Sequence, residues 1–167
     1  MLNHATNHIQ QRYKQFKNRT LIDIEKYEKQ LKTKIEMFSG SFMNNSKWTK
    51  LFIGLSNNYI EIKKCYIKSV FDDILREIKI PETENFNDSF SKTGIKDNIL
   101  TGGPCEFKEI EQIIFPYEWK SDRQMKDQKL EPKKFNQTID RIKIITDSIG
   151  KFEMDFDNEN LIIYGYR

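Results

Sequence analysis

Two histidines stand one helical turn apart near the start of the chain. His4 and His8 are the only histidines among its 167 residues, and a spacing of four places both imidazoles on one helix face, where they can share a metal ion. No third ligand stands near them in the sequence. A Ser-His or Cys-His nucleophile pair would also have to use one of these terminal imidazoles. We therefore predict no metal site, no cofactor and no enzymatic activity.

Carboxylates are the other candidates for chemistry. Asp155, Asp157 and Glu159 alternate like the first ligands of a calcium loop, but the sixth position is Asn160 rather than glycine and the twelfth is Tyr166 rather than glutamate. An exposed hairpin turn explains this pattern better. Other carboxylate pairs carry little information in a chain with 25 acidic residues. An active site built of carboxylates is an alternative that only coordinates can reveal.

Two cysteines and one glycine-rich stretch complete the search for reactive groups. Cys65 and Cys105 are too few for a disulfide framework and lack the paired spacing of a metal site. The stretch Thr101-Gly102-Gly103-Pro104 lacks the Lys-Ser/Thr ending of a phosphate-binding loop. It predicts a turn.

Composition and charge limit the class of protein. An aromatic content of 13% argues against disorder, and no apolar run is long enough to span a membrane or to mark a secretory signal. We expect a cytoplasmic protein without a membrane partner. The charge is polarised, since residues 1–70 carry 13 basic and 5 acidic side chains and residues 71–167 carry 15 and 20. Such asymmetry concerns partners and association rates rather than the fold.

The elements that must position these groups begin with a long helix. Apolar residues recur at steps of three or four over residues 5–39, and Gly40 stands where a left-handed residue would end such a helix. A break near residues 18–20 is plausible because the helix would be about 50 Å long. We assign residues 1–42 to an amphipathic helical extension and residues 43–167 to one domain.

The domain alternates helix and strand patterns. Trp48, Leu51, Phe52 and Leu55 predict a short helix capped by Asn45 or Ser46. Further along, the pattern predicts strands over 59–68 and 106–115, helices over 71–78 and 135–148, a long loop over 81–104, a charged connection over 120–134 and a hairpin from 152 to 166. This mixture indicates an α+β fold with an antiparallel sheet.

Two surfaces suit recognition of a partner. The first is the basic side of the first helix, where lysines and arginines interleave with Tyr13, Phe16 and Tyr27. This pattern is typical of a phosphate-tracking surface, although these aromatic residues fit a core stripe better. The basic residues are Arg12, Lys14, Lys17, Arg19, Lys26, Lys29, Lys32 and Lys34. The second is an acidic surface that could face a basic partner. Its candidates are residues 82–88 with Glu106, Glu109, Glu111 and Glu118.

From residue 43 onward the chain resembles a family of small bacterial proteins of unknown function. The stretches that carry the likeness are Met43-Asn44-Asn45-Ser46-Lys47-Trp48, Gly103-Pro104, Glu109-Ile110-Glu111-Gln112-Ile113-Ile114-Phe115, Gly150-Lys151-Phe152 and Leu161-Ile162-Ile163-Tyr164-Gly165-Tyr166. Residues 1–42 are additional, and Gln112 stands where an aromatic residue is often seen. Proteins of this style are similar to the immunity proteins that neutralise polymorphic or contact-dependent bacterial toxins.

What this resemblance implies is inhibition by binding. An immunity protein would present acidic and aromatic groups to a basic toxin, and the candidates are Glu82, Glu84, Phe86, Asp88, Phe90, Asp155, Asp157 and Glu159. Two alternatives remain. The first is a nucleic-acid-binding module that uses the basic helix, which is the less favoured reading, and the second is a structural protein that forms a homodimer through residues 5–39.

Overall fold

The fold is built on one antiparallel sheet. The computed structural model describes residues 21–121 and 131–167. Five strands pair in the order β2-β1-β5-β9-β8, and every neighbouring pair is antiparallel. They are β1 (Tyr66–Ser69), β2 (Leu75–Glu77), β5 (Ile110–Pro116), β8 (Met154–Phe156) and β9 (Asn160–Tyr164). The predicted α+β class with an antiparallel sheet is confirmed, and so is the C-terminal hairpin, formed by β8 and β9.

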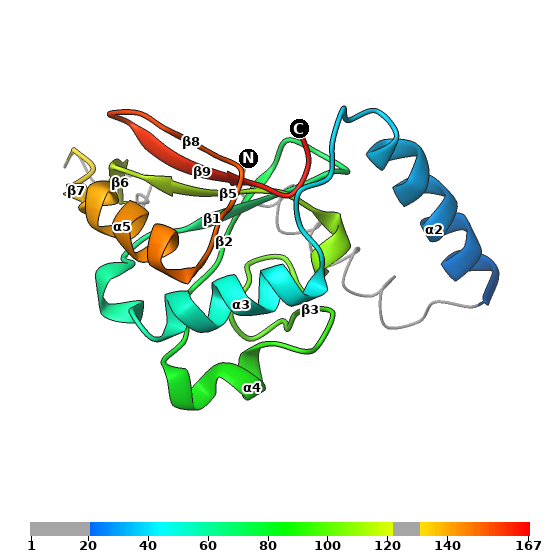
Figure 1. Cartoon of the computed structure of the whole chain (residues 1–167), viewed down its shortest axis with the longest axis horizontal. Coiled ribbons are helices and arrows are strands. Elements are labelled where there is room, and N and C mark those ends of the chain that lie inside the picture. Colours follow the sequence, from blue (N-terminus) through cyan, green and yellow to red (C-terminus); the bar gives the residue numbers. More distant parts are fainter. Residues whose placement is uncertain (1–20, 122–130) are drawn as a thin grey trace.

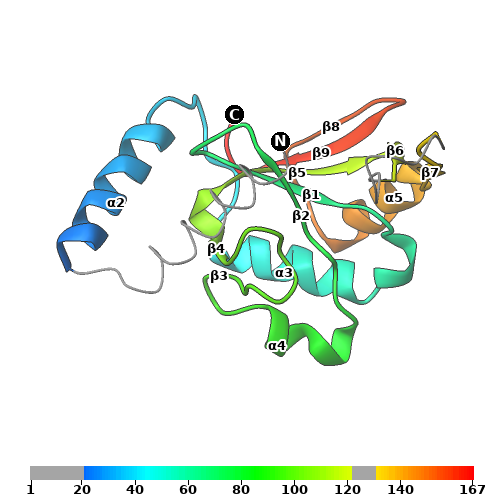
Figure 2. The same ribbon diagram turned by 180° about the vertical axis from the view of Figure 1, so that it is seen from behind.

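Two helices lie on the same side of this sheet, as Figures 1 and 2 show. They are α3 (Asn45–Ser56) and α5 (Ile139–Ile149). The four apolar residues that predicted α3 are all buried, because steps of three and four place them on one helix face. The N-cap is Asn44 rather than Asn45 or Ser46, and its Oδ1 accepts a 2.8 Å hydrogen bond from the N–H of Lys47.

The core lies between these helices and the sheet. Ile67, Ile113 and Ile163 are in register across β1, β5 and β9, and each is fully buried. Their β-branched side chains suit a pleated surface that packs against helices. Aromatic rings from outside the sheet complete the core, and Phe52 stacks on Phe107 with 5.7 Å between ring centroids.

Several predicted elements are wrong in type or extent. The strand expected over 59–68 begins only at Tyr66, because the chain first forms a 3-10 helix, η1 (Tyr59–Glu61). The helix expected over 71–78 is absent, and β2 occupies part of this stretch. The helix expected over 135–148 begins at Ile139, because β7 (Lys134–Asn136) pairs with β6 (Glu118–Lys120). Residues 122–130 of the predicted charged connection lie outside the described residues.

Short elements replace the simple loop expected over 81–104. They are η2 (Thr83–Asn85), α4 (Phe86–Ser89) and β3 (Gly94–Ile95), which pairs with β4 (Cys105–Glu106). Another 3-10 helix, η3 (Phe107–Glu109), leads into β5. The predicted turn at Gly102 and Gly103 is confirmed, since these two glycines have φ angles of 96° and 95°, which other residues adopt at a cost.

Helix α2 (Leu21–Ile35) is the described part of the predicted N-terminal helix; residues 5–20 lie outside the described residues. The helix does not continue to residue 38 or 39, and Gly40 is not left-handed. Instead Gly40 runs beside the C-terminus and exchanges two backbone hydrogen bonds of 2.9 and 3.1 Å with Arg167. Pairing with the end of the chain therefore replaces the predicted helix cap.

The buried side of α2 forms a second, smaller core with the domain. Tyr27 and Leu31 are 9% and 2% exposed and pack with Val70 and Tyr166. The predicted boundary at residue 42 thus falls between α2 and the sheet domain, but apolar contacts cross it. The predicted homodimer through residues 5–39 stays a prediction; Tyr27 and Leu31 are buried within one chain, whereas Ile22 and Ile24 on the same helix are 77% and 42% exposed.

Candidate functional site

The segment that carries most of the predicted partner-binding residues is anchored to the core. Phe90 is 4% exposed, and its ring centroid lies 4.6 Å from that of Phe52 and 4.7 Å from that of Phe86. Ile95 and Leu100 are also buried. Phe90 is therefore a core residue and offers no surface to a partner, whereas Phe86 is half-buried.

Three carboxylates of this segment face solvent. Glu82, Glu84 and Asp88 are exposed, and within residues 21–121 and 131–167 none of them forms an ion pair. Lys96 reaches this segment, but its Nζ donates to the carbonyl of Asn87 at 2.7 Å rather than to one of the three carboxylates. The negative charge of the three carboxylates is thus available to a partner.

An aromatic and an aliphatic side chain complete this surface. The negative charge of Glu82, together with partial burial and a hydrogen bond to that carboxylate, raises the pKa of Tyr59 above its ordinary value. The next residue, Ile60, is 75% exposed. We call Tyr59, Ile60, Glu82, Glu84 and Asp88 the acidic surface. Figure 1 shows its α4 segment beneath α3, on the side of that helix away from the sheet.

The three acids predicted at the C-terminal hairpin are exposed, but two of them have structural partners. Asp155 accepts hydrogen bonds from Arg167 at 3.1 Å and from the Tyr164 hydroxyl at 2.9 Å. Asp157 accepts from two backbone N–H groups of its own turn, and these bonds lower the pKa of its carboxyl. Figures 1 and 2 show this hairpin and α4 on opposite sides of α3. The two predicted sets therefore form separate surfaces.

The remaining acids of the predicted acidic surface also serve the fold. Glu106 and Glu109 form a reciprocal capping box around η3, in which each side chain accepts from the other residue's N–H. Glu111 forms a 2.9 Å ion pair with Lys68, and Glu118 a 3.2 Å pair with Lys134.

The two cysteines are the first of the groups that could carry chemistry. Cys65 and Cys105 are free and buried, and burial raises the pKa of both thiols, so they are protonated at neutral pH. Over the described ranges, no three His, Cys, Asp or Glu side chains are grouped to hold a metal ion. His4 and His8 lie outside these ranges.

None of the described helices combines the length and apolar character needed to cross a membrane.

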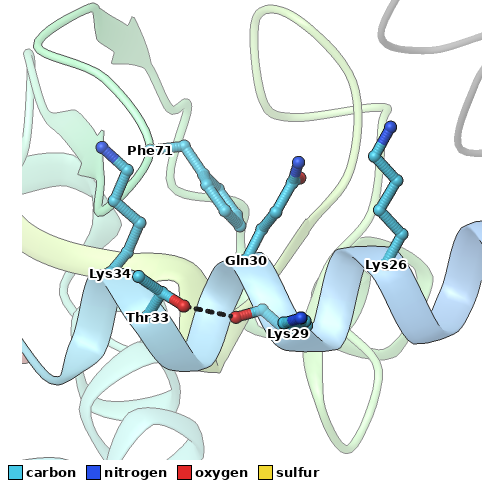
Figure 3. A pocket seen from close by; sticks show the side chains of 6 residues that line it. All are labelled: Lys26, Lys29, Gln30, Thr33, Lys34 and Phe71. Atoms are coloured by element: carbon cyan, nitrogen blue, oxygen red, sulfur yellow. Dashed lines mark hydrogen bonds between the residues drawn. The ribbon is translucent and has the colours of Figure 1, made fainter.

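One hollow was not expected from the sequence. It measures about 560 Å³ and lies between the solvent side of α2 and the chain after β1. Figure 3 shows the residues that line it: Lys26, Lys29, Gln30, Thr33, Lys34 and Phe71. The spacing of the lysines along α2 was visible in the sequence, but nothing there indicated that Phe71 lies beside them.

A smaller hollow of about 350 Å³ lies beside the C-terminal hairpin. Its lining includes the third predicted acid, Glu159, and Tyr117, which is 46% exposed.

Comparisons of the chain with protein-family models, with curated proteins and with solved structures found no match.

Proposed function

We propose that this protein is an immunity protein that binds a basic protein toxin and neutralises it, and that the acidic surface is its contact region. The observation that carries the proposal is that the exposed carboxylates of Glu82 and Glu84, neither in an ion pair with another described residue, lie close enough to Tyr59 to raise its pKa, with exposed Asp88 further along the same segment and exposed Ile60 next to Tyr59. Tyrosine is enriched among the residues that dominate binding energy, and an apolar centre with a charged rim is typical of protein interfaces.

The anchoring of the segment supports this function. A surface loop of this length would lose conformational entropy if it became fixed only on binding, which would weaken the complex. Here Phe90, Ile95 and Leu100 already hold the segment on the core. The carboxylates would then act mainly on the rate at which a basic partner associates, because charge complementarity steers the encounter.

The test begins with isolation of the partner. The tagged full-length chain is used to capture proteins from its native host, with nuclease treatment to remove nucleic-acid bridges, and the captured protein is identified by mass spectrometry. The partner is then expressed alone and together with this chain. We expect a basic protein that arrests growth when expressed alone and is harmless together with this chain. A partner without toxicity would contradict the immunity function.

Charge-reversal variants then test the contact surface. The variant Glu82→Lys, Glu84→Lys, Asp88→Lys is compared with a control that reverses three other exposed acids, Glu25, Glu36 and Glu131. We expect the first variant to slow association by about tenfold or more at low salt, and the control to change it much less. Equal association rates for the two variants would exclude the acidic surface as the contact region.

A further inference from the structure

The lysine-lined hollow on α2 combines positive charge with an aromatic wall. Figure 3 shows Lys26, Gln30 and Lys34 extending from the helix on the side where Phe71 lies, with the Phe71 ring close to Gln30. Lys34 stands eight positions after Lys26, so the two lie about 12 Å apart along the helix. The hollow is thus an elongated basic site rather than a pocket for a single small ion.

The lysines are available to an anion. Lys26, Lys29 and Lys34 are exposed, and none has an ion pair with another residue of the described ranges. One carboxylate that senses these lysines is Asp73, whose pKa is lowered chiefly by its hydrogen bond to Lys68 and more weakly by the charge of Lys34. Asp73 forms its ion pair with Lys68 at 2.9 Å, so it leaves Lys26, Lys29 and Lys34 without an ion pair in the described part of the chain.

The aromatic wall identifies the kind of anion. Phe71 is half-buried, and its ring contacts Tyr27 with 5.8 Å between centroids. The ring also lines the hollow. Bases of single-stranded nucleic acids stack on aromatic side chains while lysines contact the phosphates, and such sites tolerate many sequences. An acidic peptide would use the lysines but would gain less from a ring.

We propose that this hollow binds single-stranded nucleic acid, with Lys26, Lys29 and Lys34 on successive phosphates and Phe71 beneath a base. The side-chain amide of Gln30 stands between them and can hydrogen-bond a base or a sugar. This site shares no residue with the acidic surface, so it does not depend on the proposed function. The structure also changes the aromatic partner expected from the sequence, because Tyr27 is buried and Phe71 takes its place.

Binding of a fluorescein-labelled oligodeoxythymidine of about 15 nucleotides, followed by fluorescence anisotropy, tests the proposal on the full-length chain. The variant Lys26→Ala, Lys29→Ala, Lys34→Ala is compared with Lys50→Ala, Lys92→Ala, Lys151→Ala, which removes equal charge from other exposed positions. All variants keep Arg12, Lys14, Lys17 and Arg19, so the comparison isolates the hollow. We expect the first variant to bind about tenfold more weakly or worse, with a salt dependence reduced by roughly 0.7 per lost phosphate contact.

A second variant tests the stacking separately. Phe71→Leu keeps an apolar side chain against Tyr27 but removes the ring, and we expect binding to weaken roughly fivefold or more with an unchanged salt dependence. Thermal unfolding of each variant shows that it is folded. Equal affinities of the two triple-lysine variants would overturn the proposal. The proposal would also be overturned if an unlabelled mononucleotide competed as well as the unlabelled oligomer. Displacement of the labelled oligomer by an acidic polypeptide would overturn it too.

Discussion

The hydroxyl of Tyr27 donates a 3.2 Å hydrogen bond to the carboxylate of Glu106, and this bond joins α2 to the sheet domain. Lys108 strengthens the same junction, because its Nζ lies 2.6 Å from the Glu28 carboxylate, 3.2 Å from that of Glu106 and 5.7 Å from the centre of the Tyr27 ring. Since the lysine hollow is formed by α2 together with Phe71, this junction also holds the two walls of the hollow together.

Replacing Tyr27 by phenylalanine should weaken the junction in a pH-dependent way. Burial, followed by the negative charges of Glu109 and Glu106, raises the pKa of Tyr27 above its ordinary value of 10.0. The folded state therefore holds this proton more tightly than the unfolded state, and the stability it contributes is complete below pH 10.0 and lost as the pH rises above it. At pH 8 the Tyr27→Phe variant should lose about 1 kcal/mol.

Urea unfolding of wild type and Tyr27→Phe at several pH values measures this difference. Tyr59, Tyr164 and Tyr166 also have raised pKa values, but they are common to both proteins and cancel in the comparison. The difference in unfolding free energy should shrink as the pH rises beyond 10.0. A difference that stays constant over this range would contradict the assignment.

Gln137 should be among the most sensitive polar residues of the fold. It is 3% exposed; its Oε1 accepts from the N–H groups of Lys63 and Lys64 at 3.0 and 3.1 Å, and its Nε2 donates to the carbonyls of Lys64 and Pro116 at 2.7 and 2.8 Å. Gln137→Ala would leave these backbone groups without partners and should cost about 3 kcal/mol or more. Its exposed neighbour serves as the control, since Asn136→Ala should change the unfolding free energy by about 0.5 kcal/mol or less. Similar losses in both would show that the four hydrogen bonds contribute little.

Helix α3 was predicted correctly because its apolar pattern coincides with burial. In α3 all four periodic apolar residues are buried. The stretch 71–78 has the same helical spacing, with Phe71, Ile74, Leu75 and Ile78, yet it contains the edge strand β2. Leu75, the first residue of this strand, is 47% exposed, and Ile74 just before it is 56% exposed. The pattern misled because strand pairing with β1, rather than burial of one helix face, determines the backbone there.

The sequence predicted a candidate site only where the residues of that site are close together in the chain. Glu82, Glu84 and Asp88 are close in sequence, and their exposure followed from their type. The contribution of Tyr59, by contrast, depends on η1 and η2 lying together. In the same way Trp119 and Phe135, whose rings stack with 5.9 Å between centroids, reveal the β6–β7 hairpin only once the strands are paired. Contacts between distant segments leave no local pattern to read.

Gly165 should tolerate no side chain, although its position in an apolar strand end suggests nothing unusual. A Cβ there would overlap the carbonyl oxygen of Ile110 and stand 2.9 Å from the Trp48 ring. We expect Gly165→Ala to cost about 3 kcal/mol. Gly150→Ala is the matched control, because its Cβ would meet the Phe152 ring at 3.5 Å and Nζ of Lys50 at 3.8 Å, both ordinary van der Waals contacts. Its backbone, with a φ of 172°, is extended. Denaturant midpoints that fall equally in the two variants would refute this.

Phe90 and Asp88 should have opposite effects, although only one residue separates them in the chain. Phe90 is buried between Phe52 and Phe86, so Phe90→Ala should cost about 3 to 5 kcal/mol of stability through the cavity it leaves. Asp88 is exposed, so Asp88→Asn should leave the unfolding free energy within about 0.5 kcal/mol of wild type. If the acidic surface binds a basic partner, the same Asp88 variant should slow association measurably, and more so at low salt.

Unfolding curves and association rates of both variants, recorded with the same captured partner, separate packing from recognition. Phe90→Leu fills most of the cavity and should restore much of the stability lost in Phe90→Ala. It should also associate at the wild-type rate, because the buried ring touches no partner. A Phe90→Leu variant that is folded and stable but binds poorly would show that the ring becomes exposed in the complex. In that case the contact region would include the core side of α4 as well as its charged side.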